Sequence, residues 1–514
     1  MRLKARLLDI KAGGRSIVLL DDETAKFLGV YSSDRVKINC ENQSSIAIVN
    51  TTSDFPRDYI GLFTEISGKL KIKDGEILEV QPAERPEAIN YVKAKINGER
   101  LRENEVKLIV NDVVERHLSD IEIASFVTAL HIHGISIDET EALTTAMVET
   151  GSTLNFDKKP ILDKHSIGGI PGDKTTILVV PIVAAAGYII PKTSSRAVTS
   201  PAGTADRVET LCPVNLAVQE IREVVNKTNG CIVWGGAVDL APADDIFIQI
   251  EYPLSIDPLL LPSIMSKKKA IGATNLVVDI PTGRGAKIKT IGKAQALAHD
   301  FIDLGKRLGI NVQCAVTFGE QPLGYAIGPA LEAREAISAI MGNGPADLLE
   351  KAKNIAGIFF EMFGIRNGKQ KAEEFLKSGK AERKLREIIE AQGGNPDIKP
   401  EDIKIGDKRS AIRSNKDGKI LWINNKSIAE VAKASGAPKE KGAGIVLNKK
   451  IGEEIKKDEI LFEIFAERNT KLEEAIELTN RLKPIGLSKK PEESMLIDRI
   501  PPRAVHWETF MLDR

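Results

Sequence analysis

Residues 163–209, DKHSIGGIPGDKTTILVVPIVAAAGYIIPKTSSRAVTSPAGTADRVE, place two loops rich in Gly, Ser, Thr and basic side chains around one apolar run. From about Ile161 the sequence alternates strand-like and helix-like runs, with a strand at 276–280, a helix at about 293–308 and a strand at 312–316. Strands separated by helices of this length are typical of a mostly parallel sheet covered on both faces. Ligands of such sheets usually bind at the loops beyond the strand ends, which makes the two loops the first candidates for a site.

Before this α/β region the sequence predicts two smaller domains. Residues 1–84 alternate short apolar runs with turn formers, in the period of two that is typical of a small β domain. Residues 85–160 are predicted to form a helical domain, to which we expect a segment of about residues 236–268 to return. Two of its helices begin with capping-box pairs, Ser119 with Glu122 and Asp138 with Glu141.

The α/β domain is predicted to extend over residues 161–392, and residues 393–407 have the Gly, Pro and Asp content of a linker. Residues 405–500 alternate apolar runs and turns as in a compact module. The predicted class is therefore α/β, with a small N-terminal β domain, a helical domain, a large α/β domain with a mostly parallel central sheet, and a C-terminal β-rich (α+β) module.

The bulk composition excludes several classes of partner. Lys plus Arg and Asp plus Glu both total 72, so no global field would attract a nucleic acid polymer or an anionic membrane. The four cysteines lie far apart without CxxC spacing, which argues against a zinc site or a disulfide framework and fits a reducing compartment. Because the most apolar run is too short to span a bilayer, we expect a cytoplasmic protein with no membrane partner.

The first loop, residues 165–176, carries Gly168, Gly169 and Gly172 beside His, Lys, Ser and Thr. Glycines leave backbone N–H groups free to approach an anion, and the following helix would add its positive end. The spacing is not that of a Walker A motif. The alternative is a tight strand-to-helix turn. His165 could act as a general base, but phosphate is already an ionised nucleophile, so positioning a ligand is its more natural role.

The second loop, residues 193–206, surrounds Arg196 with hydroxyl groups. A guanidinium can grip a phosphate in bidentate fashion. A solvated loop could have the same composition, because Ser and Thr also favour turns and caps. Two such loops within forty residues indicate one ligand with two anionic groups, or two anions bound side by side.

At these loops the chain resembles the thymidine/pyrimidine nucleoside phosphorylase family. The matching residues are Lys164-His165-Ser166-Ile167-Gly168-Gly169, Asp173, Ser194, Arg196, Gly203-Thr204, Asp206 and Glu209. The likeness covers most of the chain after about residue 85. The SSRAVTSPAGTAD loop, LSIDP, DIPTGRG and the extra N-terminal domain are similar to the archaeal AMP phosphorylase branch, and Glu251 stands where the family has a pyrimidine-contacting Arg.

The resemblance implies reversible phosphorolysis of AMP, and of other nucleoside 5′-monophosphates, by inorganic phosphate to the free base and ribose 1,5-bisphosphate in nucleotide catabolism. It implies no metal and no cofactor, with phosphate as co-substrate, and a homodimer or larger homo-oligomer built with the N-terminal domain. The alternative is a thymidine or pyrimidine nucleoside phosphorylase with an unusual second loop.

The resemblance also assigns roles to residues. Asp257, in LSIDP, is the expected proton donor to the leaving base, and its apolar neighbours in the sequence would raise its pKa by burial. The implied AMP contacts are Gly169, Ser195, Arg196, Ala197, Val198, Thr199, Ser200, Thr204, Ser263 and Lys287. The implied phosphate contacts are Lys164, Ser166, Thr176, Ser194 and Thr204. Lys267 is a weaker candidate, because a Lys on a helix surface is usually just solvated.

Overall fold

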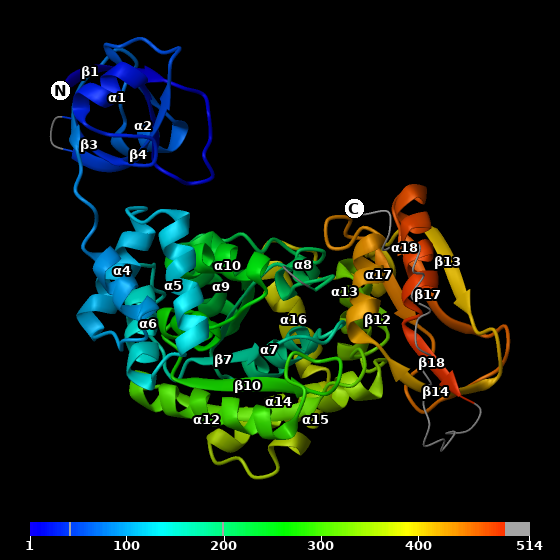
Figure 1. Cartoon of the computed structure of the whole chain (residues 1–514). Coiled ribbons are helices and arrows are strands. Elements are labelled where there is room, and N and C mark those ends of the chain that lie inside the picture. Colours follow the sequence, from blue (N-terminus) through cyan, green and yellow to red (C-terminus); the bar gives the residue numbers. More distant parts are fainter. Residues whose placement is uncertain (41–42, 198–199, 489–514) are drawn as a thin grey trace, which may run out of the picture.

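The computed structural model describes residues 1–40, 43–197 and 200–488. Figure 1 shows a small β-barrel beside a helical domain at one end of the molecule, the α/β domain in the middle and a C-terminal module at the other end. The predicted fold class is confirmed. Among the described helices, none combines the length and the apolar content that crossing a membrane requires.

The N-terminal domain is a closed barrel in the strand order β1-β5-β2-β4-β3-β6. Alternate side chains of its strands fill the interior, as the period of two predicts. Arg35 ties it to the helical domain by donating from Nε to the His117 carbonyl at 2.9 Å. The strands are β1 (Arg2–Leu7), β2 (Ile17–Asp21), β3 (Arg35–Cys40), β4 (Gln43–Thr52), β5 (Tyr59–Leu62) and β6 (Ile77–Pro82), and the short helices are α1 (Asp22–Leu28) and α2 (Thr64–Leu70).

The helical domain has an aliphatic and aromatic core that includes one helix from much later in the chain. Its members are α3 (Ala88–Ile96), α4 (Glu103–Val114), α5 (Asp120–His133), α6 (Ile137–Glu149) and the returning α10 (Pro242–Leu254). The predicted Ser119–Glu122 capping box is confirmed. The Asp138–Glu141 box is wrong, because α6 starts with Ser136 and Glu139. Glu139 is buried and also bonds Lys95 Nζ at 2.7 Å, which fixes the earlier start.

The central sheet of the α/β domain is parallel. The strands β11, β10 and β7 pair side by side, and β8 pairs with β9. The two groups meet at the bridge from Ile161 to Ile189, where the Leu162 N–H donates to the Ile189 carbonyl at 2.8 Å. The strand bounds are β7 (Leu162–Ser166), β8 (Ile190–Ser194), β9 (Gly230–Trp234), β10 (Asn275–Thr282) and β11 (Asn311–Phe318).

Apolar helices cover both faces of this sheet, which confirms the predicted arrangement. The mostly apolar α7 packs with the helices that follow β11 on one face, and α12 with α11 packs on the other. The helices are α7 (Thr175–Ala185), α8 (Thr204–Val208), α9 (Val218–Thr228), α11 (Leu260–Ala270), α12 (Ile291–Leu308), α13 (Pro329–Ile340), α14 (Ala346–Met362), α15 (Gly368–Lys377) and α16 (Lys380–Ala391).

The C-terminal module consists of antiparallel strands and two helices, and it is joined to the α/β domain by β12 pairing with β15. The predicted linker is docked rather than extended, since the Arg334 Nε donates to the Ile403 carbonyl at 2.8 Å. Residues 489–500 of the predicted module lie outside the described residues. The elements are β12 (Ala326–Ile327), β13 (Lys408–Arg413), β14 (Gly418–Ile423), α17 (Asn425–Ala434), β15 (Gly444–Leu447), β16 (Glu454–Ile455), β17 (Ile460–Ala466), α18 (Asn469–Leu482) and β18 (Ile485–Ser488).

Candidate functional site

Both predicted anion loops leave the same edge of the sheet. The first follows β7, which ends at Ser166, and the second follows β8, which ends at Ser194. Because these strands are neighbours and parallel, their carboxyl ends, and the loops beyond them, lie side by side. Gly168 and Gly169 have φ values of +81° and +89°, which side chains rarely adopt and which turn the first loop sharply.

A buried network of charges supports the first loop. The Ser166 Oγ donates to Asp279 at 2.9 Å and to Asp173 at 3.2 Å. Lys351 Nζ lies 2.7 Å from the Asp279 carboxylate and 3.2 Å from that of Asp173. Lys164 is only 2 % exposed, and its Nζ lies 3.5 Å from the Thr176 hydroxyl. The structure therefore brings together three of the five residues that the sequence predicts for phosphate.

Burial lowers the pKa of two basic side chains beside this network, those of Lys192 and His165. It lowers the pKa of Lys192 to about 7, against the attraction of Asp163 3.4 Å away. Burial, with repulsion from Lys268, Lys192 and Lys164, lowers the pKa of His165 well below its usual value. His165 is therefore a neutral imidazole at physiological pH, a form compatible with either positioning a ligand or accepting a proton.

Lys174 lies in the first loop, but its side chain is buried in the protein interior. It is fully buried and donates to the carbonyls of Leu323 at 3.1 Å and Ala326 at 3.0 Å, and it pairs with Glu335. In the sequence, Lys174 cannot be distinguished from Lys164 as a candidate for binding an anion. In the structure, Lys174 holds the segment that follows β11.

The second loop is closed by a carboxylate from α8. Asp206 accepts the backbone N–H groups of Ala197 at 2.7 Å and Gly203 at 2.9 Å, which holds both ends of the loop. A Cβ at Gly203 would lie 2.6 Å from backbone atoms of residues 195–197, so only glycine fits there. Ser200 Oγ donates to the Ala202 carbonyl at 3.1 Å. Val198 and Thr199 lie outside the described residues.

Arg196 already has partners in this loop. Its guanidinium forms a bidentate pair with Glu209, with N–O distances of 2.7 and 2.5 Å, and lies over the Trp234 ring with its Cζ 5.0 Å from the centroid. Its side chain is 31 % exposed. The sequence predicts a guanidinium that grips an anion. In this structure both terminal nitrogens hold Glu209, so a bidentate grip through them requires Arg196 to leave Glu209.

Three more predicted residues from separate segments meet beside the first loop. A Cβ at Gly169 would lie 2.4 Å from the backbone nitrogen of Lys287, so the two backbones are in close contact. Lys287 Nζ in turn forms an ion pair with the Asp257 carboxylate. Ser263 lies on α11, whose first turn begins just after Asp257, and its N–H donates to the Leu259 carbonyl at 2.9 Å. Lys267, on the same helix, pairs with a buried Asp rather than being merely solvated.

The surroundings of Asp257 differ from the expected apolar setting. Its side chain is 36 % exposed and paired with Lys287. The buried carboxyl nearby is Glu251, which is only 5 % exposed. Burial, together with repulsion from Asp257 and Asp244, raises the pKa of Glu251 to about 7. Its Oε1 accepts the Leu259 N–H at 3.1 Å, across the turn that carries Asp257. Sequence reasoning did not single it out as an acid, although its place one helical turn after the buried Phe247 is a usable signal.

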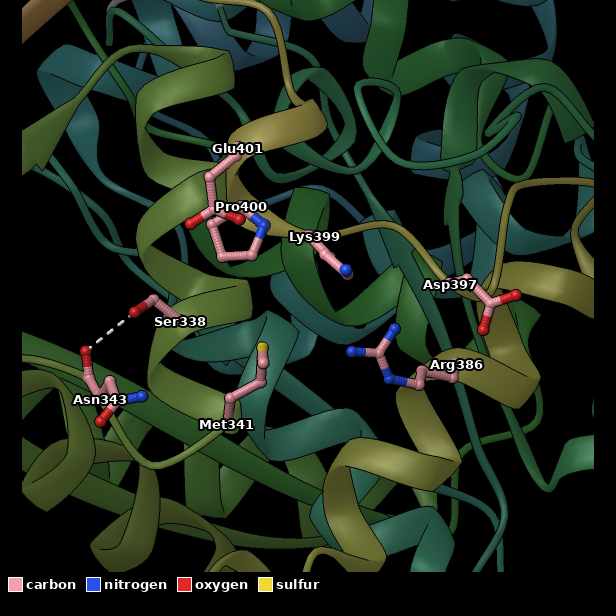
Figure 2. A pocket seen from close by; sticks show the side chains of 8 residues that line it. All are labelled: Ser338, Met341, Asn343, Arg386, Asp397, Lys399, Pro400 and Glu401. Atoms are coloured by element: carbon pink, nitrogen blue, oxygen red, sulfur yellow. Dashed lines mark hydrogen bonds between the residues drawn. The ribbon is translucent and has the colours of Figure 1, made fainter.

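A pocket elsewhere on the α/β domain does not belong to this site. Figure 2 shows it between the end of α13 and α16, with Met341, Arg386 and Lys399 among its lining residues. Arg386 is engaged by Glu382 at 2.9 Å and by the Pro396 carbonyl at 2.5 Å. The residues lining this pocket are different from the predicted site residues.

Known proteins are similar to this chain over its full length. Family models for a glycosyl transferase helical bundle domain, a glycosyl transferase a/b domain and a pyrimidine nucleoside phosphorylase C-terminal domain match residues 89–151, 158–382 and 420–485. The AMP phosphorylase of Thermococcus kodakarensis is 50 % identical, with 97 % of this chain and 99 % of that protein covered. The AMP phosphorylase of Thermofilum pendens is 46 % identical, with 98 % and 99 % covered.

The fold of the central part is also found in a solved structure. Anthranilate phosphoribosyltransferase from Thermus thermophilus is similar with a TM-score of 0.50 and 21 % identity, covering 59 % of this chain and 98 % of that one. This likeness concerns the fold alone. The identity to the archaeal proteins is far higher and spans all the domains, and on that ground the chain belongs to the family of archaeal AMP phosphorylases.

Proposed function

We propose that this protein catalyses the reversible phosphorolysis of AMP, and of other nucleoside 5′-monophosphates, to the free base and ribose 1,5-bisphosphate. Membership of the AMP phosphorylase family supports this reaction. The observation that carries the proposal is that Lys287 contacts both the Gly169 backbone and the Asp257 carboxylate. A glycine loop, a cation and an acid from three segments of the chain would then surround one sugar.

The attacking phosphate would bind where the first loop leaves β7. Lys164 and Thr176 are buried and within 3.5 Å of each other, and Ser166 lies at the end of the adjacent strand. Ser194 and Thr204 would complete the contacts from the second loop. The 5′-phosphate of AMP would bind at residues 195–200 and Thr204, with Ser263 and Lys287 near the base and sugar.

Two anions in one pocket repel each other by about 4 kcal/mol per pair of unit charges at about 4 Å and an effective dielectric near 20. The cations and free N–H groups of the two loops must offset this repulsion. Phosphate is itself the nucleophile, so the reaction needs neither a metal nor a cofactor in this proposal.

Asp257 would donate the proton that the departing adenine needs. Its carboxylate forms an ion pair with Lys287 in this structure. If AMP attracts Lys287, the Asp257 carboxyl is released from this pair and can face the base. Substrate binding would thus prepare the acid that the bond-breaking step requires.

The test is phosphate-dependent release of base by the purified protein from AMP, other monophosphates, adenosine, thymidine and uridine. We expect AMP to be cleaved fastest, with ribose 1,5-bisphosphate identified by mass spectrometry. Faster cleavage of thymidine or uridine would favour the alternative, a pyrimidine nucleoside phosphorylase, and base release without phosphate would contradict phosphorolysis.

We further propose that the protein acts in AMP breakdown in the cytoplasm as a homodimer or larger homo-oligomer. The dispersed cysteines support the location. The closed barrel at the end of the molecule supports a role in assembly, because it lies away from both loops (Figure 1). Light scattering of the full chain tests this, and a monomeric mass would contradict it.

A further inference from the structure

The C-terminal module reaches the second loop through Lys441. The residue lies in the turn between α17 and β15, and its carbonyl accepts the Ala330 N–H at 3.0 Å. The next residue, Gly442, donates to Glu467 at 2.8 Å. The Lys441 Nζ lies 3.1 Å from Asp206 and 2.9 Å from Glu209. A fixed turn of one domain therefore supplies a cation to a loop of another.

Asp206 and Glu209 share two cations in this structure, Lys441 and Arg196. Arg196 holds Glu209 with two hydrogen bonds and lies 3.5 Å from Asp206. Asp206 is 4 % exposed and already uses its Oδ2 for the loop N–H groups. A carboxylate this buried is strongly destabilised when it loses its last cation.

Arg196 cannot grip an anionic ligand with both terminal nitrogens while these face Glu209. If it turned away and no other cation were present, two carboxylates would remain unpaired beside an incoming phosphate. Lys441 removes this obstacle, because it contacts both carboxylates and is anchored from outside the loop.

We propose that Lys441 is a positioning residue that neutralises Asp206 and Glu209 while Arg196 turns to the 5′-phosphate of the nucleotide. This inference rests on the proposed function. It assigns the C-terminal module a part in nucleotide binding, and it predicts that removing Glu209's charge reduces the loss caused by removing Lys441, whose other partner is Asp206.

The first experiment compares steady-state kinetics of the full-length wild type with Lys441→Gln, Lys441→Arg and Lys439→Gln. Lys439 is an exposed residue two positions earlier, so Lys439→Gln removes the same charge as Lys441→Gln. We expect Lys441→Gln to raise the KM for AMP about tenfold, as loss of a charge-assisted contact would, with the KM for phosphate unchanged. Lys441→Arg should restore most of the loss and Lys439→Gln should have no effect. An unchanged KM for AMP in Lys441→Gln overturns the proposal.

The second experiment separates this role from simple support of the loop or direct contact with AMP. In Lys441→Gln/Glu209→Gln, Arg196 is held only by the Asp206 carboxylate 3.5 Å away, so the KM for AMP should fall part of the way back toward the wild-type value. A double variant as weak as or weaker than Lys441→Gln overturns the proposal. If the wild type binds AMP without cleaving it, the proposed function fails, and calorimetric AMP affinities of the same variants then decide on Lys441.

Discussion

Replacing Glu251 with Gln should stabilise the protein at pH 8 and have little effect at pH 5. The wild-type carboxyl is 5 % exposed, and burial raises its pKa from 4.5 to about 7. The folded protein therefore binds this proton more tightly than the unfolded chain does. Protonation of Glu251 therefore stabilises the folded state fully below pH 4.5, and this stabilisation is lost as the pH rises through about 7.

The size of the effect follows from that change in pKa, which corresponds to about 3 kcal/mol between the two ends of the window. A Gln has no proton to lose, and its amide oxygen can still accept the Leu259 N–H that Glu251 holds at 3.1 Å. The variant should therefore keep its turnover at pH 6, whereas Glu251→Ala, which removes the acceptor beneath the Asp257 turn, should lose turnover.

Differential scanning calorimetry at pH 5 and pH 8 measures this difference. The transition midpoint of Glu251→Gln should exceed that of the wild type by several degrees at pH 8 only. Glu99→Gln is the control, because Glu99 is an exposed carboxyl of the same helical domain. A shift of equal size at both pH values would refute the reasoning, since it could not come from ionisation of Glu251.

Substitutions at the proton donor and the loops should separate turnover from binding. Asp257→Asn should lower kcat for AMP about a hundredfold or more with little change in KM, because the amide cannot donate a carboxyl proton; a kcat within twofold of wild type would remove Asp257 as the acid. Arg196→Ala should weaken calorimetric binding of AMP about tenfold and leave adenosine unaffected, and equal losses would rule out contact with the 5′-phosphate. Gly169→Ala should raise the KM for AMP and lower the melting temperature, since its Cβ would lie 2.4 Å from the Lys287 nitrogen at a φ of +89°; wild-type values for both would contradict the close contact.

The fold could be predicted wherever the deciding interactions are local. The alternation of strands and helices after Ile161 and the period of two before residue 84 are local patterns that predict the parallel sheet and the small β domain. The closure of the N-terminal strands into a barrel could not be predicted from them. The start of α6 could not be chosen in this way. Both Ser136–Glu139 and Asp138–Glu141 satisfy the capping pattern, and the contact of Glu139 with Lys95, from another helix, selects the first.

The site shows the same division. Glycines and hydroxyls that can approach a phosphate lie close together in the sequence, so both loops could be recognised. The partners that set the charge of each group come from distant segments. No local pattern shows that Arg196 forms an ion pair with Glu209 or that Asp257 forms one with Lys287. Nor does it show that Lys441 of the C-terminal module pairs with Glu209. The expected apolar setting of Asp257 was wrong for this reason, because Ile256 and Leu259 pack into the helical core whereas the Asp257 side chain is exposed and paired with Lys287.

The ion pair between Lys287 and Asp257 also joins two domains. Asp257 lies in the segment that returns to the helical domain, whose core includes Leu259, whereas Lys287 follows a strand of the central sheet. The pair is therefore a bridge between the two domains. In the proposed reaction, a nucleotide that draws Lys287 to itself would replace this bridge with contacts through the ligand. Asp257 and the nucleotide would then compete for one ammonium group, and this competition would link the arrangement of the two domains to occupancy of the site.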